Sequence, residues 1–182
     1  MATPFRPALD LLVQYAEYHR DKRNIATHFI GVPMIEFGAA VLLARPTFQI
    51  GTLVLTPAWV VFVLMALWYL TRGRLALGLV TTGVWAVVML LAHQVNGGST
   101  AQWLSWGVGF FVVGWVIQFI GHYYEGRKPA FADDLVGLLS AQMFLLVELL
   151  APLGVFKGLM AEIEARVGPT LIRDLAHPAA TR

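Results

Sequence analysis

The chain of 182 residues contains no cysteine. This absence excludes disulfides and thiolate metal sites, so a bound metal would need imidazole, carboxylate or water ligands. The supply of such side chains is small, with five histidines and eleven aspartates and glutamates. Any metal site must therefore be assembled from this set.

Charge is also scarce. Only 13% of the residues are charged, 58% are hydrophobic, and the mean hydropathy is +0.67. This composition is too apolar for a soluble domain of this size and indicates an integral membrane protein. The net charge is only +2, and the basic residues lie in short clusters beside apolar runs, which is typical of topology determinants. We therefore exclude nucleic acid as a partner.

A removable secretory signal is not expected. Residues 1–27 are polar and lack a short apolar core followed by a small-residue cleavage site. Insertion should therefore rely on the internal spans.

Long apolar runs predict an all-α protein with four to five transmembrane helices. The predicted spans cover residues 29–44, 50–70, 75–92, 103–120 and 135–156. The second is the strongest, because it lacks charge and ends in the interfacial aromatics Trp68 and Tyr69. The third and fourth should form an antiparallel pair. Pro152 and Gly154 leave the last segment open between a fifth span and a re-entrant hairpin.

The two ends of the chain are more polar. Near the N-terminus, apolar residues at i, i+3, i+4 and i+7 predict an amphipathic interfacial helix on the membrane surface: Leu9, Leu12, Val13 and Ala16. In the tail, a short helix is expected over 159–167, and Pro169 and Pro178 should end any order. We expect a single membrane domain over 1–182, with the interfacial helix and motif at 9–27, the bundle at 28–156 and the polar tail at 157–182.

The basic residues predict the orientation, since lysine and arginine concentrate in cytoplasmic loops. Three loops would share that side: Arg20, Lys22 and Arg23; Arg72 and Arg74; Arg127 and Lys128. The N-terminus should thus be cytoplasmic, in a bacterial inner membrane or the ER membrane.

Two polar clusters, 18–33 and 118–130, flank the first and fourth predicted spans. His28 begins the first span and His122 ends the fourth, so alternating directions place both at the cytoplasmic boundary. His93 ends the third span, about 30 Å away across the hydrocarbon, and is expected to take no part. His19 and His28 would face opposite sides of one continuous helix, so they converge only if the chain bends at 20–24.

Each of the two span histidines has a polar neighbour on its own helical face. Asn24 precedes His28 and Gln118 precedes His122 by one turn, and such neighbours can orient an imidazole. Two histidines with a carboxylate are typical of non-haem Fe(II) oxygenases, although spacing does not choose between iron, zinc and copper. Any one histidine alone is better explained as a polar anchor at a helix end, whereas three on one side favour a site.

Two carboxylates, Glu36 and Glu148, lie inside apolar runs. A carboxylate in a span is costly and suggests function. A protonated or paired structural group explains either one equally well.

The motifs of both clusters resemble the Mpo1-like family over about residues 10–157. They read His19-x4-Asn24-x3-His28 with Gly31-Val32-Pro33, and Gln118-x2-Gly121-His122-x2-Glu125-x3-Pro129-Ala130 followed by Asp134-Leu135 and Glu148. The resemblance implies a small membrane enzyme that is Fe(II)-dependent and uses O2 to remove one carbon from 2-hydroxy fatty acids, the α-oxidation step. On this basis the metal ligands would be His19, His28 and His122.

The remaining predicted site residues have supporting roles. Glu125, Asn24 and Gln118 are the predicted catalytic residues, and we expect Glu125 to orient a histidine or pair with Arg127, because Gly126 should end the helix close by. Arg23, Arg127 and Lys128 would attract the substrate carboxylate. Two other classes remain open: a small transporter using Glu36 and Glu148, and a non-catalytic lipid-binding membrane protein.

Overall fold

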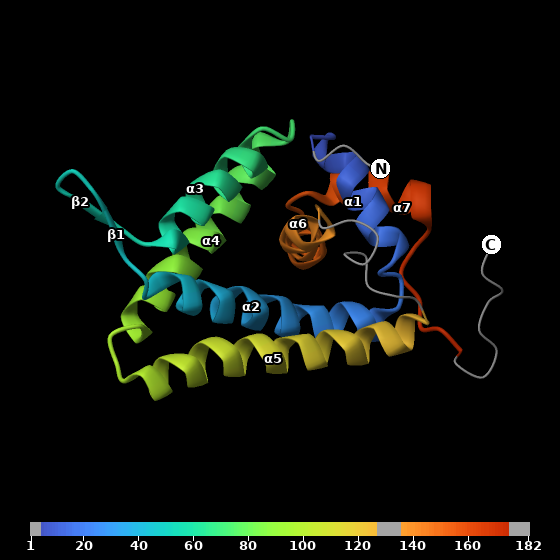
Figure 1. Ribbon diagram of the computed structural model, residues 1–182. Helices are drawn as coiled ribbons and strands as arrows, with labels where there is room; N and C mark the ends of the chain where they lie inside the picture. The colour runs from blue at the N-terminus through green and yellow to red at the C-terminus, as the bar shows by residue number, and fades with distance from the viewer. Residues whose placement is uncertain (1–4, 127–135, 175–182) are drawn as a thin grey trace. The chain divides into compact units, whose positions relative to one another are not determined.

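The computed structural model describes residues 5–126 and 136–174. This part of the chain is mostly helical, and its strands form one small hairpin (Figure 1), so the predicted all-α membrane class is confirmed. In chain order the elements are α1 (Ala8–Glu17), α2 (Lys22–Ala44), β1 (Phe48–Ile50), β2 (Leu53–Leu55), α3 (Pro57–Leu70), α4 (Leu75–Val95), α5 (Thr100–Glu125), α6 (Val136–Leu150), the 3-10 helix η2 (Ala151–Leu153) and α7 (Lys157–Val167).

Four helical segments are long and apolar enough to cross a membrane. They are α2, α4, α5 and the combined α6–η2 segment, Val136–Leu153. They correspond to the first, third, fourth and last predicted spans. The described chain thus has four candidate spans, which is within the predicted four to five.

The prediction of a second span over residues 50–70 was wrong in its extent. Helix α3 has only 14 residues, about 21 Å long, against the roughly 30 Å of a hydrocarbon core. Residues 48–55 form the antiparallel β1–β2 hairpin instead. Gly51 takes the left-handed φ of +61° in its turn, and Pro57, which has no N–H to leave unpaired, begins α3.

The chain forms two compact units. The first comprises the described residues of Met1–Ile30 and Ile117–Arg182, and the second is Gly31–Val116. Helices α2 and α5 each contribute one end to the first unit and the remainder to the second.

Helices α2 and α5 run antiparallel along a row of glycines. A Cβ on Gly114 would lie 2.8 Å from the carbonyl oxygen of Gly31, and a Cβ on Gly38 would lie 2.6 Å from that of Gly107. A Cβ on Gly121, one heptad beyond Gly114, would meet the side chains of Thr27 and Asn24. Small residues permit such close backbone approach between membrane helices.

The predicted antiparallel pair of 75–92 with 103–120 is corrected. Helix α4 packs against α3, with Gly78 so close to α3 that a Cβ would lie 2.7 Å from the Tyr69 carbonyl oxygen. Helix α5 lies along α2 instead (Figure 1). In both pairs a glycine allows the close approach of the two backbones.

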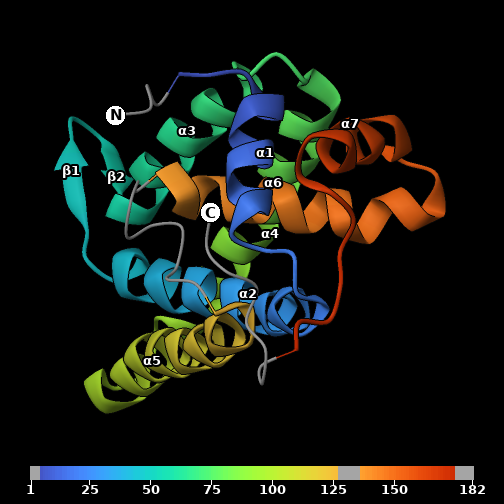
Figure 2. The same ribbon diagram turned by 90° about the vertical axis from the view of Figure 1, so that its right-hand side faces the viewer.

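In the first unit, α1 packs against α6 and α7 (Figure 2). Its apolar residues Leu11, Leu12 and Tyr15 are buried, as are Phe144 on α6 and Ile163 on α7. The predicted amphipathic helix is present, but protein covers its apolar face. Its location at the membrane surface stays a prediction.

The last segment forms a helix–turn–helix. After η2 the chain turns at Gly154 (φ +90°) and Phe156 (φ +61°), and α7 packs back on α6. The sequence left residues 135–156 open between a fifth span and a re-entrant hairpin. In the structure, α6 and η2 together are long enough to span, and the turn follows them. The tail helix predicted over 159–167 is confirmed, but the expected loss of order at Pro169 is wrong, because Leu171 pairs with the turn between α1 and α2.

Candidate metal centre

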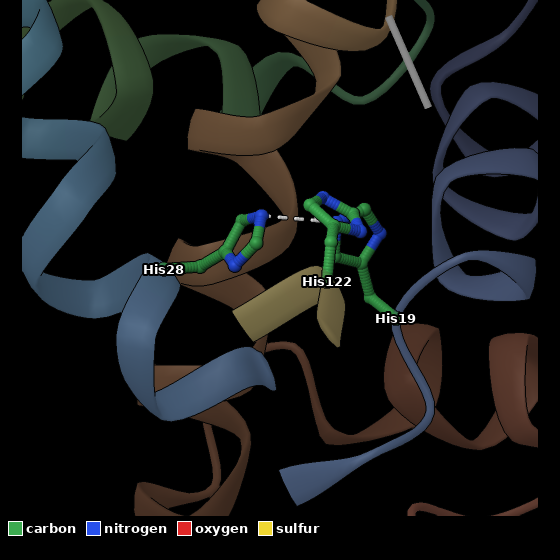
Figure 3. A group of neighbouring side chains, drawn as sticks. All are labelled: His19, His28 and His122. Carbon is green, nitrogen blue, oxygen red and sulfur yellow. Dashed lines mark hydrogen bonds between the residues drawn. The ribbon is translucent and has the colours of Figure 1, made fainter. Parts of the chain in front are cut away.

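Three histidines from separate parts of the first unit meet in its interior. His19 lies in the turn between α1 and α2, His28 on the second turn of α2, and His122 on the last turn of α5. All three are buried, and their rings point toward one another (Figure 3). One ring nitrogen from each lies within 4.8 Å of the others. The bend predicted between His19 and His28 is present, because α1 ends at Glu17 and α2 begins at Lys22.

Backbone carbonyls determine which nitrogen of two rings carries the proton. His19 Nδ1 lies 2.7 Å from the Tyr15 carbonyl oxygen, and His28 Nδ1 lies 2.8 Å from that of Asn24. A carbonyl oxygen only accepts, so both Nδ1 atoms donate. In the neutral rings both Nε2 atoms therefore carry lone pairs, and these atoms are 3.1 Å apart.

The surroundings favour the neutral ring for His19. Its ring stacks on Tyr15 with centroids 3.9 Å apart and lies near Phe144. Burial and the neighbouring His28 hold the pKa of His19 well below its usual range. A neutral imidazole with a lone pair on Nε2 is the form that binds a metal.

The geometry fits a first-row transition metal. With metal–nitrogen bonds of about 2.0–2.1 Å, the coordinating nitrogens of two imidazoles on one ion lie about 3–4 Å apart. The Nε2 atoms of His19 and His28 are 3.1 Å apart, which is already in this range. His122 is the third member of the group, and the candidate ligand nitrogens of all three residues lie within 4.8 Å of one another. Imidazole ligands suit iron, zinc and copper.

Glu125 lies beside this cluster and contacts the backbone that carries it. Helix α5 continues through Glu125 and ends as predicted at Gly126, which has φ +66°. One carboxylate oxygen, Oε2, accepts the N–H groups of Arg20 (2.9 Å) and Asp21 (2.8 Å). It also accepts Nδ2 of Asn24 at 3.1 Å. Glu125 thus holds the turn after His19.

Among the described residues, Glu125 is paired with Arg173. Arg173 places Nε 2.9 Å and Nη2 2.7 Å from Oε1 of Glu125, whereas Arg127 lies outside the described residues. The carboxylate is therefore paired with the tail of the chain.

The role expected for the Asn24 side chain differs from what the structure shows. His28 is oriented by the backbone carbonyl of Asn24 and not by its side chain, which donates to the Tyr18 carbonyl oxygen and to Glu125. Gln118 is buried one turn before His122. Its role in orienting that ring stays a prediction.

Arg23 is engaged by the protein. Its guanidinium donates to both carboxylate oxygens of Asp21 and to the Arg173 carbonyl oxygen, and it lies over the Tyr124 ring. We therefore do not assign it to the substrate carboxylate. Arg127 and Lys128 lie outside the described residues.

Asp21 is a site-supporting residue that the sequence analysis missed. Burial raises its pKa, but hydrogen bonds from Arg23 and from the Arg173 N–H outweigh this and bring the pKa to about 2. Its Oδ1 also accepts the Arg23 backbone N–H at 2.8 Å, as an N-cap of α2 would. The sequence analysis placed the first span at 29–44 and so did not expect a helix to begin directly after Asp21.

The remaining polar residues singled out from the sequence are not part of the histidine cluster. His93 is not in the cluster; it contacts Thr56 Oγ1 at 3.0 Å and stacks on Trp59. Glu36 is buried in the part of α2 that belongs to the second unit. Glu148 lies 3.7 Å from the Arg20 guanidinium, which matches a paired structural group.

The described chain is thus a helical membrane protein in which three buried imidazoles converge to form a group that could hold a metal ion. The chain belongs to the Mpo1-like family: the family described as 2-hydroxy-palmitic acid dioxygenase Mpo1-like matches residues 5–153. It is also similar to the 2-hydroxy-palmitic acid dioxygenase MPO1 of Saccharomyces cerevisiae, with 33% identity over 165 residues, 86% of this chain and 88% of the yeast protein. No solved structure matches the chain.

Proposed function

We propose that this protein is a 2-hydroxy fatty acid dioxygenase that binds Fe(II) through His19, His28 and His122 and shortens its substrate by one carbon. Family membership and the name of the yeast relative support the activity and the substrate class. The observation that carries the metal site is the pair of Nε2 atoms 3.1 Å apart, on rings whose Nδ1 protons are held by backbone carbonyls. Two such lone pairs repel each other unless a cation lies between them.

The overall reaction balances without a further reductant. A 2-hydroxy acid loses its carboxyl carbon as CO2 while the hydroxyl-bearing carbon becomes the new carboxyl, and water is the other product. This oxidation releases four electrons, which is the number that one O2 accepts. Fe(II) would supply O2 activation and a binding position for the hydroxyl and carboxylate oxygens.

The protein's own residues would keep the site ordered and dry. Tyr15 and Phe144 lie against the His19 ring, and the three histidines are at most 7% exposed. Apolar side chains are exposed along α4 and α5, for example Leu90 and Val112, as in helices that contact lipid. An acyl chain could therefore reach the protein from the bilayer.

The proposed orientation places the N-terminus and the histidines at the cytoplasmic boundary. It rests on the basic residues beside the spans, including Lys22 and Arg74. A carboxylate at the headgroup level would then remain solvated while its chain stays in hydrocarbon.

The test is turnover by the purified, Fe(II)-loaded protein in detergent or liposomes. We expect 2-hydroxypalmitate to yield pentadecanoic acid, with one O2 consumed for each product, and we expect unsubstituted palmitate to give none. Mass spectrometry and an oxygen electrode measure both quantities. Loaded protein that consumes no oxygen, or that moves the acid across liposomes unchanged, would contradict the proposal.

A further inference from the structure

The segment Gly168–Arg173 follows α7 and lies beyond the residues that match the family, 5–153. It nevertheless pairs like a strand with the turn that carries His19. The Leu171 N–H donates to the Arg20 carbonyl oxygen at 2.8 Å, and the Lys22 N–H donates to the Leu171 carbonyl oxygen at 2.9 Å. The Arg20 side chain also donates from Nη1 to the Gly168 carbonyl oxygen at 2.7 Å. The tail is therefore bound directly beside His19.

The end of this segment reaches Glu125. Arg173 donates through Nε and Nη2 to Oε1 of Glu125, and its backbone N–H donates to Asp21 at 2.7 Å. The Glu125 side chain is fully buried, whereas that of Arg173 is 23% exposed. Arg173 thus brings a positive charge from the surface to a buried carboxylate.

Glu125 connects the backbone segments of the three histidines. It is three residues after His122 on α5, and its Oε2 accepts the Arg20 N–H, next to His19. The same atom accepts the Asn24 side chain, and the Asn24 carbonyl oxygen holds the His28 ring. Any displacement of this carboxylate would move the three ligand positions relative to one another.

We propose that Arg173 is a positioning residue for the three-histidine site, so that metal affinity depends on the tail segment Gly168–Arg173. The inference rests on the proposed metal site but not on the identity of the substrate. With Arg173 in place, the carboxylate of Glu125 has a direct counter-charge and accepts both backbone N–H groups of the His19 turn. Without it, a buried carboxylate faces amide donors with no direct counter-charge, and the turn that carries His19 relaxes.

The experiment measures the affinity of metal-free protein for Co(II) by absorption spectroscopy, and for Fe(II) under anaerobic conditions against a competing chelator. Arg173→Gln removes the charge, and Arg173→Lys keeps it but loses the two-pronged contact. The matched control is Arg166→Gln, because among the described residues the partner of Arg166 on α7 is Asp10, in an exposed ion pair. A second control, Ile163→Val, loosens the buried core of α7 without touching Glu125.

We expect Arg173→Gln to weaken metal binding by about 10–100-fold, the usual effect of removing a partner behind a ligand. Arg173→Lys should lie between that variant and the wild type, and Arg166→Gln should match the wild type. Ile163→Val should lower the melting temperature with little change in affinity. If Arg173→Gln does not fold, the lysine variant decides the question by the same measurement.

The inference is overturned if the Arg173 variants bind metal as tightly as the wild type, or if their loss is no greater than that of Ile163→Val. A wild-type protein that binds no metal overturns both this inference and the proposed function. A wild-type protein that binds metal but leaves 2-hydroxypalmitate unoxidised overturns only the function, and the affinity comparison still decides the role of Arg173.

Discussion

His19 Nε2 lies 3.1 Å from His28 Nε2, although the two residues are nine apart in the chain. Each ring is held from behind by a backbone carbonyl oxygen one turn earlier, on Tyr15 and on Asn24. The two Nε2 atoms are thereby held close together, and a ring nitrogen of His122 lies within 4.8 Å of them. This preorganisation suits metal binding, because little side-chain reorganisation is needed when the ion enters.

The first prediction concerns the three ligands. His19→Ala, His28→Ala and His122→Ala should each lower bound iron and turnover by at least about 100-fold, because each removes one imidazole of the three in the cluster. Metal analysis and oxygen consumption measure this, and membrane insertion should be retained. His93→Ala is the control and should keep iron and activity, since His93 contacts Thr56 and Trp59 instead. Full iron in the His28 or His122 variant would refute the assignment.

The second prediction concerns Glu125→Gln. The variant keeps one oxygen acceptor but replaces a charged acceptor of five hydrogen-bond contacts, so we expect a loss of about 10–100-fold in metal affinity with weak residual turnover. The free energy of unfolding should fall by about 2 kcal/mol or more. Calorimetry and metal titration measure the two effects. Complete loss of iron would instead make Glu125 a direct ligand.

The third prediction concerns the pH dependence of the metal-free protein. The pKa of His19 is lowered on folding from its ordinary value of 6.5, so the unfolded chain binds the proton more readily. Its contribution to stability is complete above about pH 6.5 and is lost as the pH falls, by up to about 1.4 kcal/mol per pH unit. Denaturant unfolding at pH 5–8 in chelator measures the slope, and His19→Gln should reduce it. An unchanged slope would contradict burial of a neutral ring.

The contribution of Asp21 to stability should depend on pH in a separate, more acidic range. Its pKa falls from 3.8 to about 2 on folding, so its contribution is complete above about pH 3.8 and disappears as the pH approaches 2. Asp21→Asn should therefore lower stability at neutral pH and remove this acidic component. The measurement is the same unfolding series extended to lower pH.

The fourth prediction tests the glycine contacts between α2 and α5. Gly114→Ala places a Cβ 2.8 Å from the Gly31 carbonyl oxygen, so it should destabilise the protein by about 1–3 kcal/mol. Gly109→Ala, on the same helix but with nothing within 4 Å of its Cβ, should be neutral or slightly stabilising. Thermal unfolding in detergent compares them. Equal effects would show that helix propensity, and not the contact, explains the result.

The fifth prediction is topological. Because the native chain has no cysteine, single cysteines report sidedness through an impermeant reagent. Ser99→Cys and Arg74→Cys, both at exposed positions, should label from opposite sides of the membrane. Labelling from the same side would refute the proposed orientation.

The sequence by itself determined the class of the protein and the content of the site. Apolar runs of bilayer length predicted the helical membrane class, since burial of apolar surface and backbone hydrogen bonding leave few alternatives in lipid. The spacing of His19 and His28 predicted a bend, because nine residues of continuous helix would separate the rings. The turn between α1 and α2 provides that bend.

Tertiary structure alone decided how the site is held together. Arg173 meets Glu125 across 48 positions of sequence, and no local pattern encodes such a pair, because its stability comes from the burial of one carboxylate among donors from distant segments. The pairing of α2 with α5 likewise depends on glycines that make contact only after folding. Charge-free residues 50–56 looked like part of a span, yet a glycine turn and a helix-initiating proline made them a hairpin, because local backbone conformation prevailed over hydropathy.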